Sequence, residues 1–517
     1  MATAPKWALP ADVAARAVQC LDDASAHTVG TQAADGSWYK LSEPRILENA
    51  VVALSLAGIE QAQAARARAV RWLGSAVPQQ HDPLVAAADR WLLDLCTLPE
   101  APALANLSAH DGPHSRRALY LHALACAAGV PGADADRLLS SARAALGSDR
   151  GQRVKPWQRI LLLAFEAIAC SALDEPLPAD TVGDLGRAQS ADGSFYGMPL
   201  VTGILHLTLA RVAPGHEMTW RCRDNLLASQ QADGTWRFAI SEVWDTGLMV
   251  RAFRGHPGFE AAALDGALEL LSSTQNEDGG WSCTAPLDSD NDTTGNTLLA
   301  LAGTPWIDRV RAAAGGYARR NQTPQGLWTT WLSSDDTPVP DVVAHMAAGI
   351  AAAGLTEVDL GPARKWLAEL GARGRWESDW YIPPAYSAAE IAPAVGSLPH
   401  SRSALAELLQ TQRADGGWPR IPDEPYSSPT ATGLALTALA AGGPAVPDQA
   451  VEAAVRFLID TQRGDGTWSD LPVMYGPRPF LTVTATHVHA LASRGLRDVL
   501  LATHDLWAAH DATGARR

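Results

Sequence analysis

The sequence predicts an all-α protein of the α/α-toroid type, and three observations point to it. Alanine, leucine and arginine are abundant while runs of β-branched residues are scarce, a composition that favours helices. A Gln-Gly-Trp motif recurs along the chain at a near-constant interval. The segments that flank the motif carry the caps and apolar stripes of amphipathic helices.

The recurring motif is Gln, three residues, Gly, one residue, and an aromatic side chain. Its copies begin at Gln32, Gln189, Gln230, Gln275, Gln322, Gln412 and Gln462. From Gln189 onward the steps between successive copies are 41, 45, 47, 90 and 50 residues, and a degenerate copy, "LGARGRW", lies in the longest step. A period in this range indicates repeated helix pairs or propeller blades.

The flanking sequence decides in favour of helix pairs. Before Gln462, "PDQAVEAAVRFLIDTQ" has apolar residues at 451, 454, 455, 458 and 459, the stripe of an amphipathic helix. After Gln412, Ser428 can cap a helix that starts at Pro429 and stops at Gly442. Each unit is therefore a helix, a turn and a second helix. Propeller blades would need strands, so repeated helix pairs that close into a toroid are the better interpretation.

Within each turn, the residue types suit a structural role. Gly supplies the turn conformation, the Gln amide can bond exposed groups at a helix end, and the Trp can stack over the turn. We therefore expect the tryptophans of the motif to be scaffold residues that do not touch a substrate. Four of them are Trp38, Trp236, Trp418 and Trp468.

Charge and composition exclude several function classes. The formal net charge is −15, and no block of like charges occurs, which argues against nucleic acid and anionic membrane surfaces. The six cysteines are scattered without a CxxC pair, as expected for reduced thiols in a cytosolic protein. The N-terminus lacks the apolar core of a signal peptide. The longest apolar stretch, 160–173, is interrupted by Glu166 and is too short to cross a bilayer. We expect a soluble, cytoplasmic protein without stable membrane insertion, and leave its oligomeric state open.

The segment "PLDSDNDTTG" (286–295) is the densest acidic cluster near a repeat. Such clusters are common in solvated turns. The spacing of Asp288, Asp290 and Asp292 also fits the start of an EF-hand loop, but Thr293 stands where Gly is needed and Leu299 where a bidentate Glu is needed. The calcium interpretation therefore fails.

A third interpretation of this segment is a Brønsted acid. Protonating an isolated alkene requires a carboxylic acid that stays neutral in a water-poor pocket, whereas a lone Asp has a pKa of ~3.9 and would be ionised. Burial with a nearby carboxylate or hydrogen-bond donors can keep it protonated. Asp-x-Asp followed by Thr, at Asp290, Asp292 and Thr293, supplies such a pair.

The glutamine–tryptophan repeats on helix pairs resemble those of the squalene–hopene cyclase and class II terpene cyclase superfamily, over the whole chain. The resemblance implies two α/α barrels in the βγ architecture, with γ inserted after the first β helix. On this basis we place γ at 19–236 and β at 1–18 plus 237–517. The β domain then carries the acidic segment.

The resemblance also implies roles for named residues. Class II cyclases carry Asp-x-Asp-Asp here, with the middle Asp as the acid, so Asp292 would be the general acid and Asp290 its supporting carboxylate. Thr293 replaces the last Asp, a variant that resembles the bacterial drimenyl diphosphate synthases. "PDVVAHM" is similar to a family segment whose His bonds the acid, which implies that role for His345.

Aromatic positions are implied for the pocket wall. "EVWDTGL" resembles the family's Val-Trp-Asp-Thr stretch and implies Trp244, while "RWESDWYIPPAY" resembles its Arg-Trp-Gly-x-x-Tyr region and implies Trp380 and Tyr386. Phe480 is a further candidate. Aromatic faces stabilise a carbocation by ~2 kcal/mol or more when desolvated. Plain core packing is the competing interpretation for each.

The implied substrate is a prenyl diphosphate whose diphosphate is retained, and no DDxxD motif occurs in the chain. "WQRILLLAFEAI" resembles the γ-domain stretch in which diterpene relatives place a magnesium-associated Glu, which implies Glu166 as a ligand of Mg²⁺. Additional acids of that pattern are not repeated here.

Taken together, we expect an isomerase that cyclises farnesyl diphosphate to a bicyclic drimane-type diphosphate. One alternative is geranylgeranyl diphosphate and a labdane (copalyl-type) product. Another class of α/α toroid, the protein prenyltransferase β subunits, needs a zinc site of Asp, Cys and His, and Cys283 shows no such spacing. A non-catalytic toroid used for binding is also open, because a fold does not fix a function.

Overall fold

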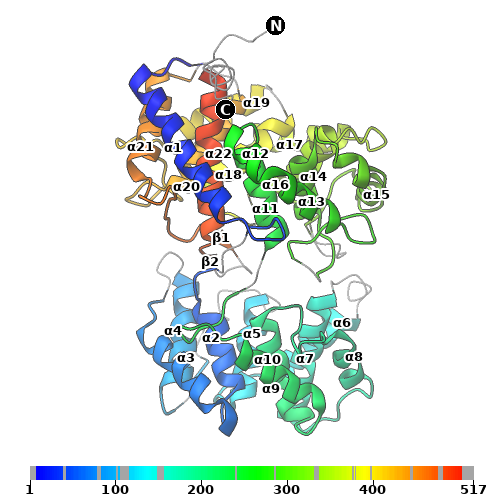
Figure 1. Cartoon of the computed structure of the whole chain (residues 1–517). Helices are drawn as coiled ribbons and strands as arrows, with labels where there is room; N and C mark the ends of the chain where they lie inside the picture. Colours follow the sequence, from blue (N-terminus) through cyan, green and yellow to red (C-terminus); the bar gives the residue numbers. More distant parts are fainter. Residues whose placement is uncertain are drawn as a thin grey trace.

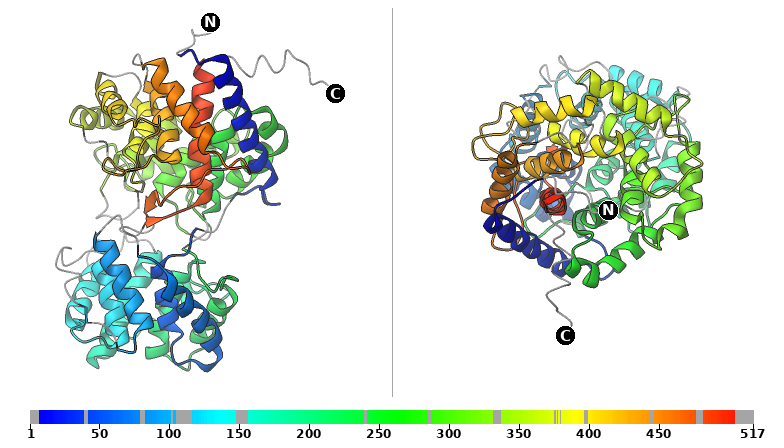
Figure 2. Two further views of the ribbon diagram at one scale, coloured as in Figure 1. Left: turned by 90° about the vertical axis from the view of Figure 1, so that its left-hand side faces the viewer. Right: turned by 90° about the horizontal axis from the view of Figure 1, so that it is seen from above.

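The computed structural model describes residues 7–38, 42–78, 83–100, 103–104, 116–147, 156–238, 241–284, 287–330, 337–374, 376, 378, 380–395, 399–442, 446–475 and 481–503. Helices are the main secondary structure of these residues, and they form two stacked helical domains (Figures 1 and 2). Each domain has a hydrophobic core of its own. The all-α, two-toroid prediction is therefore confirmed.

The upper domain of Figure 1 holds both ends of the described chain. Its helices are α1 (Ala11–Gly30), α11 (Glu242–Phe253), α12 (Pro257–Ala262), α13 (Leu264–Ser273), α14 (Asn291–Leu301), α15 (Ile307–Arg320), α16 (Pro340–Ala352), α17 (Gly361–Ala372), α18 (Pro384–Val395), α19 (Pro399–Gln410), α20 (Pro429–Gly442), α21 (Asp448–Thr461) and α22 (Ala485–Thr503). A short antiparallel hairpin, β1 (Met474–Tyr475) with β2 (Leu481–Thr482), pairs Met474 with Thr482.

The lower domain contains the intervening part of the chain. Its helices are α2 (Ile46–Ser55), η1 (Glu60–Ala62), α3 (Gln63–Ser75), α4 (Pro83–Thr97), α5 (Arg116–Ala128), α6 (Ala135–Gly147), α7 (Pro156–Leu173), α8 (Thr181–Ala188), α9 (Pro199–Val212) and α10 (Glu217–Ala228). The lower domain is thus inserted between α1 and α11.

The upper domain is a closed double ring. In the inner ring, α11, α14, α16, α18, α20 and α22 each contact the next, and α22 returns to contact α11. The remaining helices lie outside them, as the view from above shows (Figure 2). The inner helices are buried nearly all round, and α20 accordingly is apolar on all sides.

The repeat turns join the outer helices to one another. In each complete copy the Gln side chain donates to the carbonyl of the motif Gly and to a carbonyl of the next outer helix or the residue that precedes it; Gln462, for example, donates to Gly466 and to Cys20 of α1 at 2.9 and 2.8 Å. This contact links α21 to α1 and so closes the outer ring between the two ends of the chain.

The motif Gly residues need their conformational freedom. Gly36 has a φ of +89°, and a Cβ there would meet the Gly266 carbonyl oxygen at 2.2 Å. The motif tryptophans are buried and bond their own helix; Trp468 Nε1 donates to the Leu458 carbonyl at 2.8 Å. Trp38, Trp236 and Trp418 make the equivalent bond, which is the scaffold role expected from the sequence.

The expected domain boundary at residues 18 and 19 is wrong. Helix α1 runs unbroken across it and buries Val13, Ala17, Leu21 and Ala24 against the upper core, which also contains Trp38. One continuous apolar stripe cannot be divided between two domains. At the other boundary, Trp236 packs in the lower core and Val243 in the upper one.

One described helix, α7, is long and apolar enough to cross a membrane by length and composition alone. It spans Pro156–Leu173, because the helix starts before the apolar stretch 160–173 that the sequence suggested was too short. More than half of it is buried within the lower domain, as in the core helix of a globular domain.

Candidate active site

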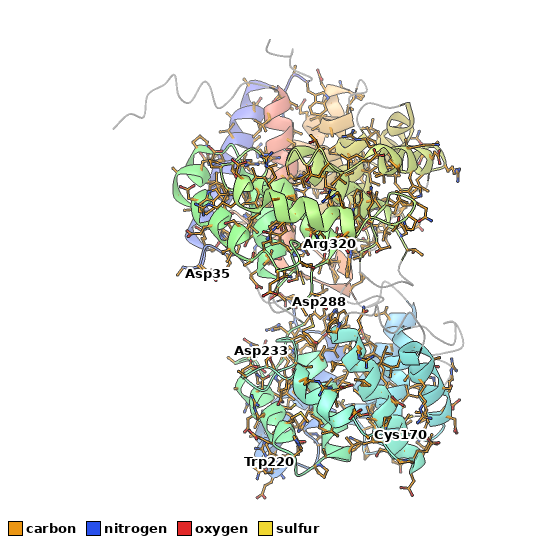
Figure 3. The ribbon with its side chains drawn as sticks, turned by 90° about the vertical axis from the view of Figure 1, so that its right-hand side faces the viewer. Asp35, Cys170, Trp220, Asp233, Asp288 and Arg320 are labelled. Atoms are coloured by element: carbon orange, nitrogen blue, oxygen red, sulfur yellow. The ribbon has the colours of Figure 1, made fainter. Side chains whose placement is uncertain are left out.

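The candidate site lies in the first turns of the inner helices, at the end of the upper domain that faces the lower domain. Figure 3 shows Asp35 and Asp233, both in repeat turns, on the facing sides of the upper and lower domains, and Asp288 at the lower edge of the upper one. Helix α14 starts three residues after Asp288. The acidic segment therefore faces the junction between the domains.

The acidic segment is folded as a helix cap. Asp290 is the N-cap of α14: its Oδ1 accepts from the Thr293 backbone N–H at 2.6 Å, and its Oδ2 accepts from Thr293 Oγ1 at 2.9 Å. This is the preferred use of Asp at a helix start. Asp290 is 5% exposed and Asp292 6%, so the solvated-turn interpretation is wrong.

The direct partner of Asp292 is His345. Nδ1 of His345 lies 2.6 Å from Oδ1 of Asp292 across the contact between α14 and α16. Among the residues that the structure describes, Oδ2 of Asp292 accepts no hydrogen bond. One oxygen of Asp292 is thus held by His345, and the other has no described partner, which is the geometry expected of a group that exchanges a proton with a ligand through Oδ2.

The expected pairing of Asp290 with Asp292 takes another form. Both carboxylate oxygens of Asp290 are engaged by Thr293, so Asp290 supports the acid by fixing the first turn of α14 on which Asp292 stands. Thr293 contributes the matching donors. The two residues thus position the acid through the helix cap.

Behind His345 lies a buried charge cluster that the sequence did not suggest. Nε2 of His345 is 3.0 Å from Oε2 of Glu390 on α18, an ion-pair distance without well-directed hydrogen-bond geometry. Arg251 of α11 donates to the same oxygen at 2.5 Å, and Arg494 of α22 donates to Oε1. The cluster therefore ties three inner helices to the residue that holds the acid.

The charges in this cluster determine its protonation. Burial alone would lower the pKa of His345, but the charges of Asp292 and Glu390 outweigh it and raise that pKa to about 9. Burial would raise the pKa of Glu390, but Arg251, Arg494 and His345 hold it well below its ordinary value. Beside an ionised Asp292, His345 is therefore an imidazolium near neutral pH, and this charge stabilises the carboxylate that Asp292 becomes once it has given up a proton.

Aromatic rings surround the pair. The ring of Trp244 lies 5.9 Å from that of His345, and the ring of Tyr386 lies 6.2 Å from it on the α18 side, both edge-on. Trp380 is half-buried and packs against the upper core, but it is not among the rings that contact His345. Phe480 lies outside the described residues. The structure thus brings Trp244 and Tyr386 to the acid.

Glu166 does not fit the magnesium role. It is buried in α7, where its Oε1 accepts from Nε of Arg143 at 2.9 Å, near Cys170. Figure 3 shows Cys170, one turn further along α7, low in the lower domain and far from the junction. Among the described residues no group of three or more His, Cys, Asp or Glu side chains could hold a metal ion. The paired arginine already neutralises this carboxylate.

A cavity of about 230 Å³ lies at the junction instead. The start of α2, with α3 and α4, lines it from below, and Pro472 with the β2 region lines it from above. Its polar residues include Glu43, Arg45 and Asp89. Arg45 is buried against Glu48 and lies over the Phe238 ring.

Several buried polar residues of the site have no motif of their own. Glu390 is the single charge of α18, whereas Arg251 and Arg494 lie on helices that carry other charges, and the three meet only when the ring closes. One signal was available: Arg251 lies seven residues after Trp244, and Arg494 seven after His487. Two helical turns place such pairs on one face of a helix.

Comparisons with known proteins agree with the fold. No family model matches the chain. The chain is 28% identical to the drimenyl diphosphate synthase of Streptomyces showdoensis over 334 residues, which is 62% of this chain and 55% of that protein. The match thus spans little more than half the length of that relative. The structure of ent-copalyl diphosphate synthase from Streptomyces platensis is similar over 96% of this chain and 100% of that one, with a TM-score of 0.54 and 17% identity. The sequence similarity to that synthase supports the class II terpene cyclase assignment that the repeats and the acidic segment indicated, and the structural similarity shows a shared fold.

Proposed function

We propose that this protein cyclises farnesyl diphosphate to a bicyclic drimane-type diphosphate and retains the diphosphate. The observation that carries the proposal is the buried Asp292, whose Oδ1 is held by His345 while its Oδ2 has no described partner. The sequence relation to a drimenyl diphosphate synthase favours the C15 substrate.

In the proposed reaction, Asp292 donates its proton to the terminal alkene of the substrate. The resulting tertiary cation is attacked by the next double bond, and a second closure follows. Trp244 and Tyr386 present rings next to the acid and can stabilise positive charge without trapping it. The His345 imidazolium stabilises the Asp292 carboxylate during these steps. Proton loss from the final cation gives the product.

The diphosphate end of the substrate would lie toward the lower domain. The junction cavity is lined by Glu43 and Asp89 and by Arg45, whose guanidinium is paired with Glu48. Mg²⁺ usually binds one or two carboxylates together with phosphate oxygens, so these acids fit a magnesium-diphosphate group better than Glu166 does. When bound, the ion would neutralise the diphosphate charge. We propose Mg²⁺ as the cofactor on this basis and a cytoplasmic location for the enzyme.

The test is incubation of the purified protein with farnesyl or geranylgeranyl diphosphate and Mg²⁺, followed by dephosphorylation and product analysis. A bicyclic C15 alcohol from the first substrate supports the proposal. Turnover of the C20 substrate alone would assign the copalyl-type reaction instead. Cyclisation of neither substrate, with the folded protein still binding them, would support the non-catalytic toroid.

A further inference from the structure

Next to the acid lies a second buried network of polar side chains, which has no role in the reaction proposed above. Tyr381, just before α18, places its hydroxyl 2.8 Å from Nδ1 of His487 on α22. Nε2 of His487 lies 2.7 Å from Oδ1 of Asp245 on α11. All three side chains are at most 2% exposed. They join three different elements at the mouth of the inner ring.

The hydrogen bonds fix the direction of this chain. Asp245 also accepts from Ser241 Oγ at 2.8 Å and from Thr486 Oγ1, so it acts as the acceptor for His487 Nε2–H. In the tautomer that carries its hydrogen on Nε2, the ring presents the lone pair of Nδ1 to Tyr381, and the phenol donates its hydrogen to it. Burial raises the pKa of Tyr381 well above its ordinary value, which keeps it a neutral phenol.

One lone pair of the Tyr381 oxygen remains. Trp244 Nε1 donates to this oxygen at 3.3 Å, and the hydroxyl hydrogen goes to His487. A phenol oxygen has two acceptor positions, so the second can take a proton. A hydroxyl backed by His and Asp is the arrangement in which a weak base gains proton affinity from its neighbours.

The position of Tyr381 relative to the acid suits the end of the reaction. Its ring stacks on Tyr386 at 4.0 Å, and Tyr386 in turn contacts His345. Tyr381 and the acid thus lie in one aromatic cluster, yet no described bond connects Tyr381 to Asp292. After two ring closures the cation lies on a carbon remote from the one first protonated, so the proton donor and the proton acceptor must be different groups.

We propose that Tyr381 is the terminating base of the cyclisation, with His487 and Asp245 as its positioning relay; this rests on the proposed function above. A C–H bond next to the cationic carbon breaks, and its electron pair forms the new C=C bond. The proton goes to the Tyr381 oxygen while the phenol's own proton passes to His487 Nδ1. The imidazolium so formed faces Asp245, and its proton returns to solvent after product release. Because Asp292 gives one proton and Tyr381 takes one, the reaction is a net isomerisation.

The first test is Tyr381→Phe, which keeps the stacked ring and removes the hydroxyl. We expect substrate consumption to continue at a reduced rate, since Asp292 and His345 are intact. The product should change from a single alkene to a mixture in which water-quenched alcohol or shifted alkene isomers make up a tenfold larger share. The measurement is product analysis by gas chromatography after dephosphorylation.

Tyr120→Phe is the matched control. Tyr120 is buried in the core of the lower domain, where its ring lies 5.3 Å from that of Phe165. This variant loses a buried phenol hydroxyl away from the acid and should keep the alkene-to-alcohol ratio of the wild type. His487→Gln should reproduce the product change of Tyr381→Phe, because Gln cannot take up the proton at Nδ1.

The outcomes separate this inference from the proposed function. If wild-type protein makes no cyclic product, the function itself fails. If wild-type protein cyclises and folded Tyr381→Phe and His487→Gln, verified by circular dichroism, give the wild-type product ratio, then the function stands and the relay is overturned. If both variants unfold, Asp245→Asn decides: an unchanged product ratio from that variant would also overturn the relay.

Discussion

His345 Nε2 lies 3.0 Å from Glu390 Oε2, on the side of the ring opposite the one that meets Asp292. The histidine thereby connects the acid to a carboxylate that two arginines neutralise. A buried ion pair of this kind is costly to break on one side only. The contact with Glu390 keeps the His345 imidazolium oriented toward Asp292.

Glu390→Gln should impair both stability and catalysis. Removal of the charge leaves Arg251 and Arg494 buried without their carboxylate, which typically costs about 3–5 kcal/mol. It also removes a charge that raises the pKa of His345. The free energy of unfolding, measured with denaturant, and kcat should both decrease. A variant with full stability and full kcat would show that the cluster is dispensable.

The stability of the folded protein should depend on pH through His345. Its pKa of about 9 lies above the ordinary value of 6.5, so its contribution is fully present below pH ~6.5 and is lost as pH rises through about 9. Unfolding midpoints of wild type and His345→Asn, measured between pH 6 and 10, check this. The gap between the two proteins should narrow toward high pH; a constant gap would contradict the assignment.

Asp290 and Asp292 should separate into different roles. Asp292→Asn should leave the fold intact and abolish cyclisation. Asp290→Ala removes the cap of α14 and should cost about 1 kcal/mol of stability, with reduced but measurable turnover. Parallel unfolding curves and product assays on the two variants are the measurement. If Asp290→Ala lost as much activity as Asp292→Asn and kept its stability, Asp290 would take part in the proton transfer itself.

Glu166→Gln should leave the magnesium dependence of the reaction unchanged. The residue is paired with a half-exposed Arg143, so its loss should cost about 1 kcal/mol of stability or less. The Mg²⁺ concentration for half-maximal activity is the measured quantity. A severalfold increase would restore the ligand role that the sequence suggested. Glu43→Gln is the comparison variant. For this variant we expect the Mg²⁺ concentration for half-maximal activity to increase.

The half-buried Gln462 of the last repeat closes the outer ring, and its loss should destabilise the fold. Gln462→Ala removes two hydrogen bonds that link α21 to α1, at about 1 kcal/mol each. Gln19→Ala, on the exposed face of α1, is the control and should change stability by less than ~0.5 kcal/mol. Equal unfolding midpoints for the two variants would contradict the closing role.

The sequence predicted the parts of this molecule that are encoded locally or repeated. The spacing of Gln, Gly and Trp predicted the helix pairs and the scaffold role of the tryptophans, since each turn is completed by its own residues. The resemblance of two short segments correctly brought Asp292 and His345 together although 53 positions separate them. The prediction of the domain boundary was wrong because no sequence signal in α1 indicates which of the two cores its apolar face packs against.

The rest of the site could not be predicted because it arises from ring closure. Glu390 meets Arg251 and Arg494 only because the closed inner ring brings side chains of α18, α11 and α22 together. Tyr381, His487 and Asp245 likewise come from distant segments. In the sequence, each of these residues taken alone looks like an ordinary core or loop residue. Their role depends on which helices the toroid makes neighbours.

Deuterium incorporation is the measurement that tests the role of Asp292 most directly. Wild-type protein and Asp292→Asn are equilibrated in D₂O and then given farnesyl diphosphate. The product of the wild-type protein should carry one deuterium on the ring carbon formed from the protonated terminal alkene, and the variant should return unlabelled linear substrate. A cyclic product without deuterium at that carbon, or normal turnover by Asp292→Asn, would contradict the account.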